Sequence, residues 1–256
     1  SQGKKLISSL QDWNNRYPSS LLALTLAIEY EENSEHIKAH KIYTQIIKES
    51  PKDREANIND AVILYKHLGR SKTAIKQLQL VLNNTSENSP NFVKSIIHAH
   101  IGSAYVHLKQ FKNAEKSFAR AIAMDNQNLN LIDFTAATYR ENKATKHLAS
   151  LLKNISRSQP GTGVVYAILA ETLSEKLGHH DEAIEAFSNA IVLDPNRSDY
   201  YNGMGLAYYR KKDFNSALNT FSEASKIDPN DAVARYNEAC IHSLLNNKSK
   251  AINKLK

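Results

Sequence analysis

The stretch FSNAIVLDPN at residues 187–196 returns as FSEASKIDPN at residues 221–230, 34 positions later. A near-copy at this spacing predicts a stacked structural repeat, because short repeats bury their apolar faces only against their neighbours. The chain has 256 residues, 41% of them hydrophobic, which can supply a continuous core along such a stack. The other residues of the chain show how far this repeat extends.

Most of the prolines recur along the chain with the same period. Proline lacks an N–H and disfavours the helical conformation in the residue before it, so a proline after an apolar helical pattern predicts a helix end. Five of the six prolines follow such a pattern at steps near 34 or a multiple of it: Pro18, Pro51, Pro160, Pro195 and Pro229. Pro90 is the exception and lies in a longer connection, NNTSENSPN.

Two sets of core residues recur between these helix ends. In the second helix of a unit, residues spaced by four and three fall on one helical face. They are Ala39, Tyr43 and Ile46; Ala114, Phe118 and Ala121; Leu148, Leu152 and Ile155; Ala183, Phe187 and Ala190; and Ala217, Phe221 and Ala224. In the first helix, a small residue precedes a large one by three positions: Ala27 and Tyr30, Gly102 and Tyr105, Ala136 and Tyr139, Ala170 and Leu173, and Gly205 and Tyr208. Gly102 and Gly205 indicate tight helix contact, since glycine costs a helix about 0.8–1 kcal/mol against alanine.

Each unit is therefore predicted to be two antiparallel helices joined by a short turn, and residues 1–256 to be one array. Six whole units are expected at residues 20–53, 54–94, 95–128, 129–162, 163–197 and 198–231. Residues 1–19, with Leu6, Leu10 and Trp13, are interpreted as the second helix of a partial unit. Residues 232–256 are interpreted as a truncated unit with Ala239 and Ala251 at its small positions. The fifth unit carries one extra residue around EKLGHHDE.

The small–Tyr pair, the Ala-x3-Phe-x2-Ala run, the terminal proline and the period of 34 resemble the tetratricopeptide repeat family. The resemblance covers nearly the whole chain and is clearest over residues 163–256. It implies an all-α fold, a right-handed superhelical solenoid of antiparallel helix pairs. The nearest rival is the pentatricopeptide repeat, a helix pair of nearly the same period that binds single-stranded RNA. Small residues at both helix crossings and the recurring Asp-Pro-Asn ends favour the tetratricopeptide repeat.

The resemblance also implies a binding groove, because first helices line the concave side of tetratricopeptide superhelices. The residues expected there are Asn59, Ile63, Lys66, His67, His100, Ser103, His107, Asp133, Arg140, Glu171, Asn202, Leu206 and Tyr209. Their mixed chemistry argues against a simple polyanion as ligand. His67 and His107 occupy the same place in successive first helices, so stacking should bring them near each other. The lysines with which some family members grip the C-terminal carboxylate of chaperones are missing from the matching positions.

The turns inside the units carry many cations. Stacking should align them as a basic edge formed by Lys109, Lys112, Lys143, Lys146, Arg210, Lys211 and Lys212. A solvated edge is the simpler interpretation, and an acidic partner is the functional one. Proteins that bind single-stranded nucleic acid usually interleave aromatic side chains with the cations. These turns have few rings, so we do not expect a nucleic-acid partner.

The sequence contains no catalytic constellation: it lacks a glycine-rich phosphate loop, a nucleophile elbow and a His-Glu-x-x-His helix. His179 and His180 are adjacent in a predicted turn, where neighbouring residues rarely converge on one ion, and Cys240 is the single cysteine. We therefore expect no enzymatic activity, no metal and no cofactor. The longest nearly apolar run, residues 21–28, is too short to cross a bilayer.

Two functions remain open at this point. The first is a scaffold that binds a peptide or partner protein in the concave groove. The second is a regulatory or targeting region of a larger enzyme, or of a bacterial envelope or exopolysaccharide-export assembly, to which residues 4–27 bear a weak likeness. An RNA-binding repeat ranks below both.

Both ends cut into a helix pair, so we expect the chain to belong to a longer repeat protein. Its next helix would cover Ile252 and Leu255, and adding it should raise the melting temperature. The lone cysteine favours a reducing, cytoplasmic compartment, with the bacterial envelope as the alternative.

Overall fold

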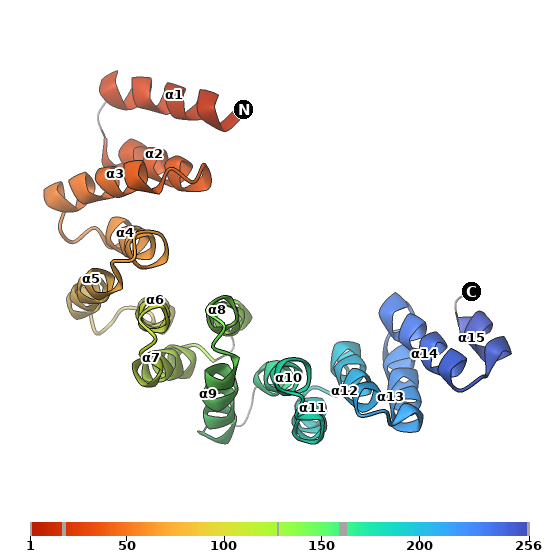
Figure 1. The fold of residues 1–256 in the computed structure, drawn as a ribbon. Coiled ribbons are helices and arrows are strands. Elements are labelled where there is room, and N and C mark those ends of the chain that lie inside the picture. Colours follow the sequence, from red (N-terminus) through yellow and green to blue (C-terminus); the bar gives the residue numbers. More distant parts are fainter. Residues whose placement is uncertain (1, 17–18, 127, 159–162, 255–256) are drawn as a thin grey trace. The chain divides into compact units, whose positions relative to one another are not determined.

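The computed structural model describes residues 2–16, 19–126, 128–158 and 163–254 (Figure 1). Over these residues the chain is all α-helical and holds no strand. It divides into two compact units, Ser1–Asp125 and Asn126–Lys256, which we call unit 1 and unit 2. Within each unit successive antiparallel helix pairs pack on one another, so the predicted all-α solenoid of helix pairs is confirmed.

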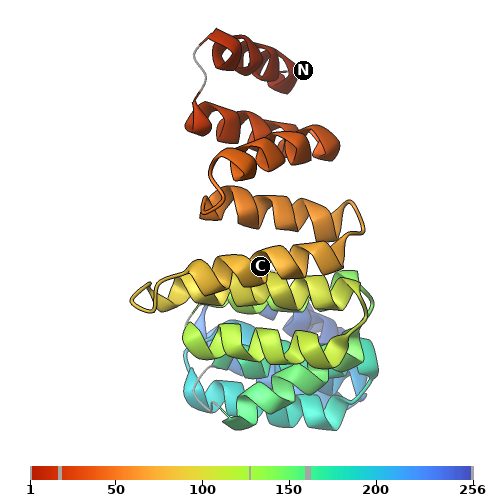
Figure 2. The ribbon, with the colours of Figure 1, turned by 90° about the vertical axis from the view of Figure 1, so that its left-hand side faces the viewer.

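Unit 1 begins with α1 (Gln2–Arg16) and continues with three helix pairs. The pairs are α2 (Ser20–Glu32) with α3 (His36–Glu49), α4 (Arg54–Lys66) with α5 (Ser71–Asn84), and α6 (Asn91–His107) with α7 (Phe111–Met124). Figure 2 shows these helices from the side, stacked in chain order from red to yellow-green. The first helices α4 and α6 also contact each other, so they share one face of the stack.

Unit 2 contains four further pairs. They are α8 (Leu129–Glu141) with α9 (Thr145–Ser158), α10 (Gly163–Glu171) and its continuation η1 (Thr172–Leu177) with α11 (His180–Leu193), α12 (Ser198–Arg210) with α13 (Phe214–Ile227), and α14 (Ala232–Leu244) with α15 (Lys248–Lys254). First helices again touch along the stack, α8 with α10, α10 with α12, and α12 with α14. We call the surface that the first helices form in either unit its first-helix face.

The positions predicted to repeat form the core. The large members of the second-helix set, Tyr43, Phe118, Leu148, Phe187 and Phe221, are all fully buried or nearly so. The tight contacts predicted at glycine are confirmed as well. A Cβ atom added to Gly102 would lie 2.9 Å from the Phe118 ring, and one added to Gly205 would lie 2.6 Å from the Phe221 ring.

The helix ends follow the prolines where the structure describes them. α3, α11 and α13 end at Glu49, Leu193 and Ile227, just before Pro51, Pro195 and Pro229. Pro18, Pro160 and Leu255 lie outside the described residues.

Two details of unit 1 differ from what the sequence predicts. α6 begins at Asn91 rather than at Ser95, because Pro90 occupies its N-cap with a φ of −53° and extends the helix backwards. In α1, Ile7 is buried and Leu10 partly buried, whereas Leu6 and Trp13 are exposed, so the packed face is rotated from the predicted one.

The extra residue of the fifth unit is absorbed by the π-helical segment η1. A π-helix closes its hydrogen bonds over one more residue than an α-helix, and such turns are frequent at functional sites. The His179 N–H bonds the Leu173 carbonyl at 2.9 Å, across Gly178 with a φ of 72°. The first helix is therefore widened, and α11 and α13 still begin in matching frames, at His180 and Phe214.

Each described turn inside a helix pair contains one residue in the left-handed region: Ser34, Gly69, Lys109, Lys143, Gly178, Lys212 and Asn246. At Lys109 the turn is a Schellman motif, in which the Lys109 N–H bonds the Val106 carbonyl at 2.8 Å and the Gln110 N–H bonds the Tyr105 carbonyl at 2.9 Å. These bonds offset the left-handed cost of about 1–2 kcal/mol for a residue with a side chain. The backbone therefore fixes where three lysines of the predicted edge project.

Candidate binding surfaces

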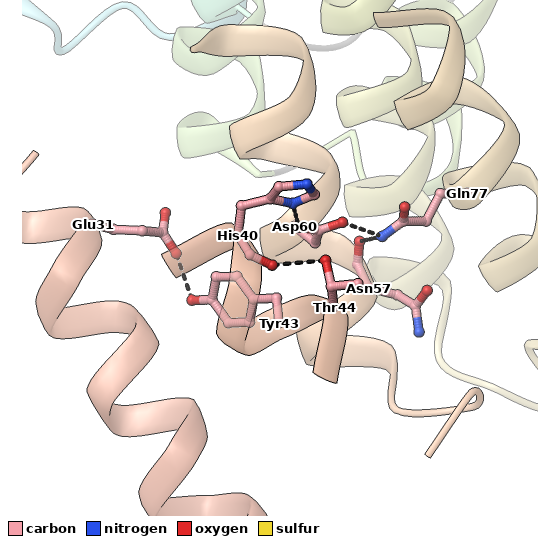
Figure 3. A network of polar contacts seen from close by, with 7 residues as sticks. All are labelled: Glu31, His40, Tyr43, Thr44, Asn57, Asp60 and Gln77. Carbon is pink, nitrogen blue, oxygen red and sulfur yellow. Dashed lines mark hydrogen bonds and ion pairs between the residues drawn. The ribbon is translucent and has the colours of Figure 1, made fainter. Parts of the chain in front are cut away.

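A buried polar network joins α3, α4 and α5 of unit 1 (Figure 3). The His40 Nδ1 atom lies 2.5 Å from Oδ1 of Asp60, whose side chain is 4% exposed. Gln77 Nε2 donates to Asp60 Oδ2 at 3.2 Å and to the Asn57 carbonyl at 2.9 Å. A buried carboxylate is costly unless it is paired and hydrogen-bonded. These bonds therefore set the register of three helices and leave Asp60 no free oxygen for a ligand.

Beside this network, α2 and α3 meet through a tyrosine hydroxyl. Tyr43 donates to Glu31 Oε1 at 2.5 Å, and Asn59 Nδ2 donates to the same hydroxyl oxygen at 3.4 Å. Partial burial raises the pKa of the Glu31 carboxyl, with the Tyr43 hydrogen bond acting in the opposite direction. Half-buried Asn59, a predicted groove residue, thus contributes its amide to the wall of the first-helix face.

A cluster of rings follows on unit 1. The His36 and His67 rings are stacked, with centroids 3.6 Å apart and planes 14° from parallel. The His107 centroid is 5.3 Å from that of Tyr65, and the Tyr65 hydroxyl is 3.1 Å from Nδ1 of His100. Partial burial lowers the pKa of His67, and burial lowers the pKa of His100 to about 4. His67 and His100 are therefore neutral at pH 7 and present hydrogen-bonding groups, not charge.

Two predicted groove residues of unit 1 belong to the core instead. Ile63 is 0% exposed and Ser103 is 3% exposed, so neither offers surface to a ligand. α4 contacts α3, α5 and α6, and α6 contacts α4, α5 and α7, which leaves each of these helices only a narrow outward strip. Lys66 and His67 lie on that strip and are exposed.

In unit 2, charged side chains bridge neighbouring first helices. Arg140 Nη2 of α8 lies 3.6 Å from Glu171 Oε2 of α10, with both side chains about half exposed, and Asp133 is exposed on α8. Arg210 of α12 donates to Ser174 Oγ at 3.3 Å and to Glu175 Oε1 at 3.1 Å in η1. Arg210 was assigned to the basic edge by the turn pattern, and the structure corrects this: it forms part of the first-helix face.

Two cavities open between the first helices of unit 2. The first, which we call the acidic cavity, has a volume of about 280 Å³ and is lined in part by Glu171, Glu175, Asp199, Asn202 and Asp231. The second, which we call the apolar cavity, has a volume of about 400 Å³ and is lined in part by Leu206, Tyr209, Phe221, Cys240 and Leu244. Leu206 borders both cavities, so they adjoin along α12.

Several lining residues of these cavities escaped the sequence pattern. Glu175 lies in the π-helical segment, where the extra residue shifts the frame, and Asp199 and Asp231 lie at the starts of α12 and α14, outside the repeating first-helix positions. Leu244 lies at the end of α14, beyond the small and large residues that recur in the first helices. The sequence contains each of these acidic or apolar residues, but it does not show which residue of another repeat lies beside it.

The predicted basic edge is exposed but partly compensated. Lys109, Lys112, Lys143, Lys146 and Lys212 are exposed. Lys211 Nζ, in contrast, lies 2.6 Å from Asp181 Oδ1, and this hydrogen bond raises the pKa of the lysine.

The paired histidines of unit 2 also have nearby partners. His179 Nδ1 lies 2.9 Å from Glu182 Oε1, and His180 Nδ1 lies 3.1 Å from Ser174 Oγ. In the part of the chain that the structure describes, no three His, Cys, Asp or Glu side chains are grouped so that they could hold a metal ion.

Sequence comparison matches these repeats directly. Family profiles described as Tetratricopeptide repeat match residues 97–128 and 198–231, and a profile described as TPR repeat matches residues 176–212. Residues 97–128 and 176–231 of the chain are therefore tetratricopeptide repeats. Tetratricopeptide repeat chains are scaffolds for protein–protein interaction and are generally non-catalytic.

Curated relatives share this organisation over part of their length. Anaphase-promoting complex subunit 3 of Schizosaccharomyces pombe is 24% identical over 234 residues, which cover 89% of this chain and 33% of the relative. Superkiller complex protein 3 of Mus musculus is 22% identical over 172 residues, which cover 63% of this chain and 11% of the relative. This tetratricopeptide chain thus spans a third or less of these relatives.

Among solved structures, the C-terminal part of a TPR repeat-containing protein from Cytophaga hutchinsonii has a TM-score of 0.53 at 14% identity. The likeness covers 91% of this chain and 93% of that one, and it shows the fold alone. No described helix of the tetratricopeptide chain is both long enough and apolar enough to span a membrane.

Proposed function

We propose that this tetratricopeptide chain is a non-catalytic scaffold that binds a peptide or partner protein on its first-helix faces. The observation that carries the proposal is the contrast between two sets of positions. The core positions repeat from unit to unit as small and large apolar residues. The exposed strip of the first helices varies instead, from His67 to Asp133, Arg140 and Glu171.

Packing requires uniform core residues but places no such demand on the strip. A varied lining is therefore free to provide specific contacts, and in most interfaces a few residues dominate the affinity, at a cost of about 2 kcal/mol or more when truncated. The acidic and the apolar cavity add concave surface to this strip. The residues proposed for the interface are Asn59, Lys66, His67, His100, His107, Asp133, Arg140, Glu171, Asn202, Leu206 and Tyr209.

Alanine replacement of His100, Asp133 and Arg140 together tests this proposal against an affinity-captured partner. We expect the dissociation constant to rise at least about tenfold, as follows from the loss of more than 1.4 kcal/mol of contact energy. Replacement of Lys143, Lys211 and Lys212 on the edge is the matched control, and it should mainly change the salt dependence of binding.

Circular dichroism should show that both triple variants keep their helices. If His100→Ala disturbs folding through the loss of its Tyr65 contact, the Asp133→Ala and Arg140→Ala double variant replaces it. Binding that is abolished by the edge variant and unaffected by the first-helix variant would refute the proposal and identify the basic edge as the site.

A second candidate function is a scaffold region within a larger assembly. It is favoured by the relatives, two of which are named as members of complexes and are matched over only 33% and 11% of their own length. Copurification of the full-length protein with stable partners at fixed stoichiometry would support it.

A further inference from the structure

We propose that the first-helix face of unit 2 binds a peptide segment in which a lysine or arginine and a large apolar residue lie about three positions apart. The inference rests on the proposed function and specifies the ligand chemistry of one surface. Two adjoining cavities carry it, one acidic and one apolar.

The acidic cavity is short of positive charge. Among its lining residues, Glu171, Glu175, Asp199 and Asp231 are acidic and Arg210 is the cation, although the chain as a whole has a net charge of +7. Arg210 is bonded to Glu175, and Arg197 from outside the cavity lies 2.7 Å from Asp199. Glu171 and Asp231 are the carboxylates with the weakest compensation.

Glu171 shows the effect of this crowding. Its ion pair with Arg140 is long, at 3.6 Å. Partial burial raises the pKa of Glu171, and the like charges of Glu175 and Asp199 raise it further, against the attraction of Arg140. A ligand cation placed beside Glu171 would relieve this repulsion.

Asp231 and Asn202 supply acceptors in the same place. Asp231 caps α14 by accepting from the Val233 and Ala234 N–H groups, and it accepts Asn202 Nδ2 at 2.7 Å. Asn202 is 7% exposed, and its Oδ1 atom has no hydrogen-bond partner among the described residues. Buried polar atoms are normally satisfied, so this oxygen is suited to accept a bond from an ammonium or guanidinium donor.

The apolar cavity provides the second contact. Of its lining residues, Phe221 is nearly fully buried, whereas Tyr209 and Leu244 have 43% and 52% of their surfaces exposed. Covering such apolar side chains removes them from water and is therefore favourable. A leucine, methionine or aromatic side chain of a ligand would fill this space.

The geometry of α12 sets the spacing between the two contacts. Asn202 borders the acidic cavity and Tyr209 the apolar one, on the same helix. Seven residues of helix span about 10 Å, and an extended peptide covers about 3.3–3.6 Å per residue. The basic and apolar side chains of the ligand should therefore be about three residues apart. The acidic lining also disfavours nucleic acid and anionic lipid on this face.

Selection of random dodecapeptides displayed on phage, with residues 1–256 as bait, tests the inference. We expect enrichment of sequences with Lys or Arg about three positions from Leu, Met, Phe or Tyr. A synthetic peptide of the enriched sequence is then titrated by fluorescence anisotropy. Glu171→Gln should weaken the affinity for this peptide at least fivefold, and Leu244→Ser should weaken it at least tenfold. Changing the basic residue of the peptide to glutamine should remove the effect of Glu171→Gln.

Matched controls lie on the second helices of the same unit. Glu223→Gln changes an exposed carboxylate, and Val192→Ser changes a side chain that is 80% exposed, and neither lines either cavity. Both should leave the affinity within twofold. The inference would be overturned if Glu171→Gln and Leu244→Ser both bind the peptide with wild-type affinity. It would also be overturned if the selection enriched acidic peptides or enriched no peptide.

Failure of this inference is distinguishable from failure of the proposed function. If the affinity for the peptide is unchanged in both unit 2 variants but falls in Lys66→Ala or His67→Ala, the inference is wrong and the scaffold proposal still holds. Peptides insensitive to every first-helix variant would count against both. The chain could instead dimerise in sedimentation experiments and lose this dimerisation in Leu244→Ser. That result would identify a second copy of the chain as the occupant of this surface and would also overturn the inference.

Discussion

Glycine at a helix crossing is the residue-scale feature on which the packing depends most directly. Gly205 on α12 faces Phe221 on α13, and a Cβ atom there would stand 2.6 Å from the ring, closer than real contacts allow. Phe221 is nearly fully buried, so its ring has little room to move. The glycine is needed for this approach in spite of its poor helix propensity.

Gly205→Ala should therefore destabilise the chain. The alanine gains up to about 1 kcal/mol of helix propensity, but overpacking of a buried ring costs about 1–3 kcal/mol, so the net change is a loss. The midpoint of urea unfolding, followed by circular dichroism, measures it. Combining Gly205→Ala with Phe221→Leu should cost less than the sum of the single changes, because the smaller side chain makes room. A raised midpoint in Gly205→Ala would show that the ring yields easily.

At the scale of elements, the network around Asp60 joins three helices that the apolar core alone would allow to slide. Asp60→Ala leaves the His40 ring and the Gln77 amide without their partner in a mostly buried place, and it should lower the unfolding free energy by about 3 kcal/mol. Asp60→Asn keeps a hydrogen-bond acceptor and should lower the unfolding free energy by less than Asp60→Ala does. Urea unfolding of both variants measures the difference.

An exposed ion pair provides the control for this network. Glu223 and Lys226 lie 2.7 Å apart with both side chains more than half exposed, so Glu223→Ala should change stability by only about 0.5 kcal/mol. An equal effect of Asp60→Ala and Glu223→Ala would mean that the network does not hold the helices in register.

At the scale of the whole molecule, charge is distributed unevenly along the sequence. Residues 1–125 contain 17 Lys and Arg against 12 Asp and Glu, and residues 126–256 contain 16 against 14. Most of the net charge of +7 therefore belongs to unit 1, whereas the acidic cavity belongs to unit 2. A polyanion and a basic peptide should accordingly prefer different units.

A fluorescent oligouridylate tests this separation as a polyanion probe. We expect weak binding at about 50 mM salt that is lost near about 200 mM, because it depends on counterion release. Lys109→Ala with Lys112→Ala should weaken it, and Glu171→Gln should not. Tight binding that persists at the higher salt concentration would instead support an RNA-binding repeat.

The sequence alone determined the repeat, its period and its core. Residues such as Tyr43, Phe118 and Phe221 were predictable because a helix of period 3.6 must bury one face, and each repeat solves the same packing problem. Pro51, Pro195 and Pro229 marked helix ends for an equally local reason, since proline constrains the residue before it.

The tertiary structure decided which polar residues reach a ligand. Ile63 and Ser103 were expected on the first-helix face and are buried, whereas Arg210 turns from the edge toward Glu175. Helical spacing gives the direction of a side chain but not the distance to its neighbours from other repeats. Exposure and charge pairing depend on those distances, so the acidic and the apolar cavity could be found only once the helices were in place.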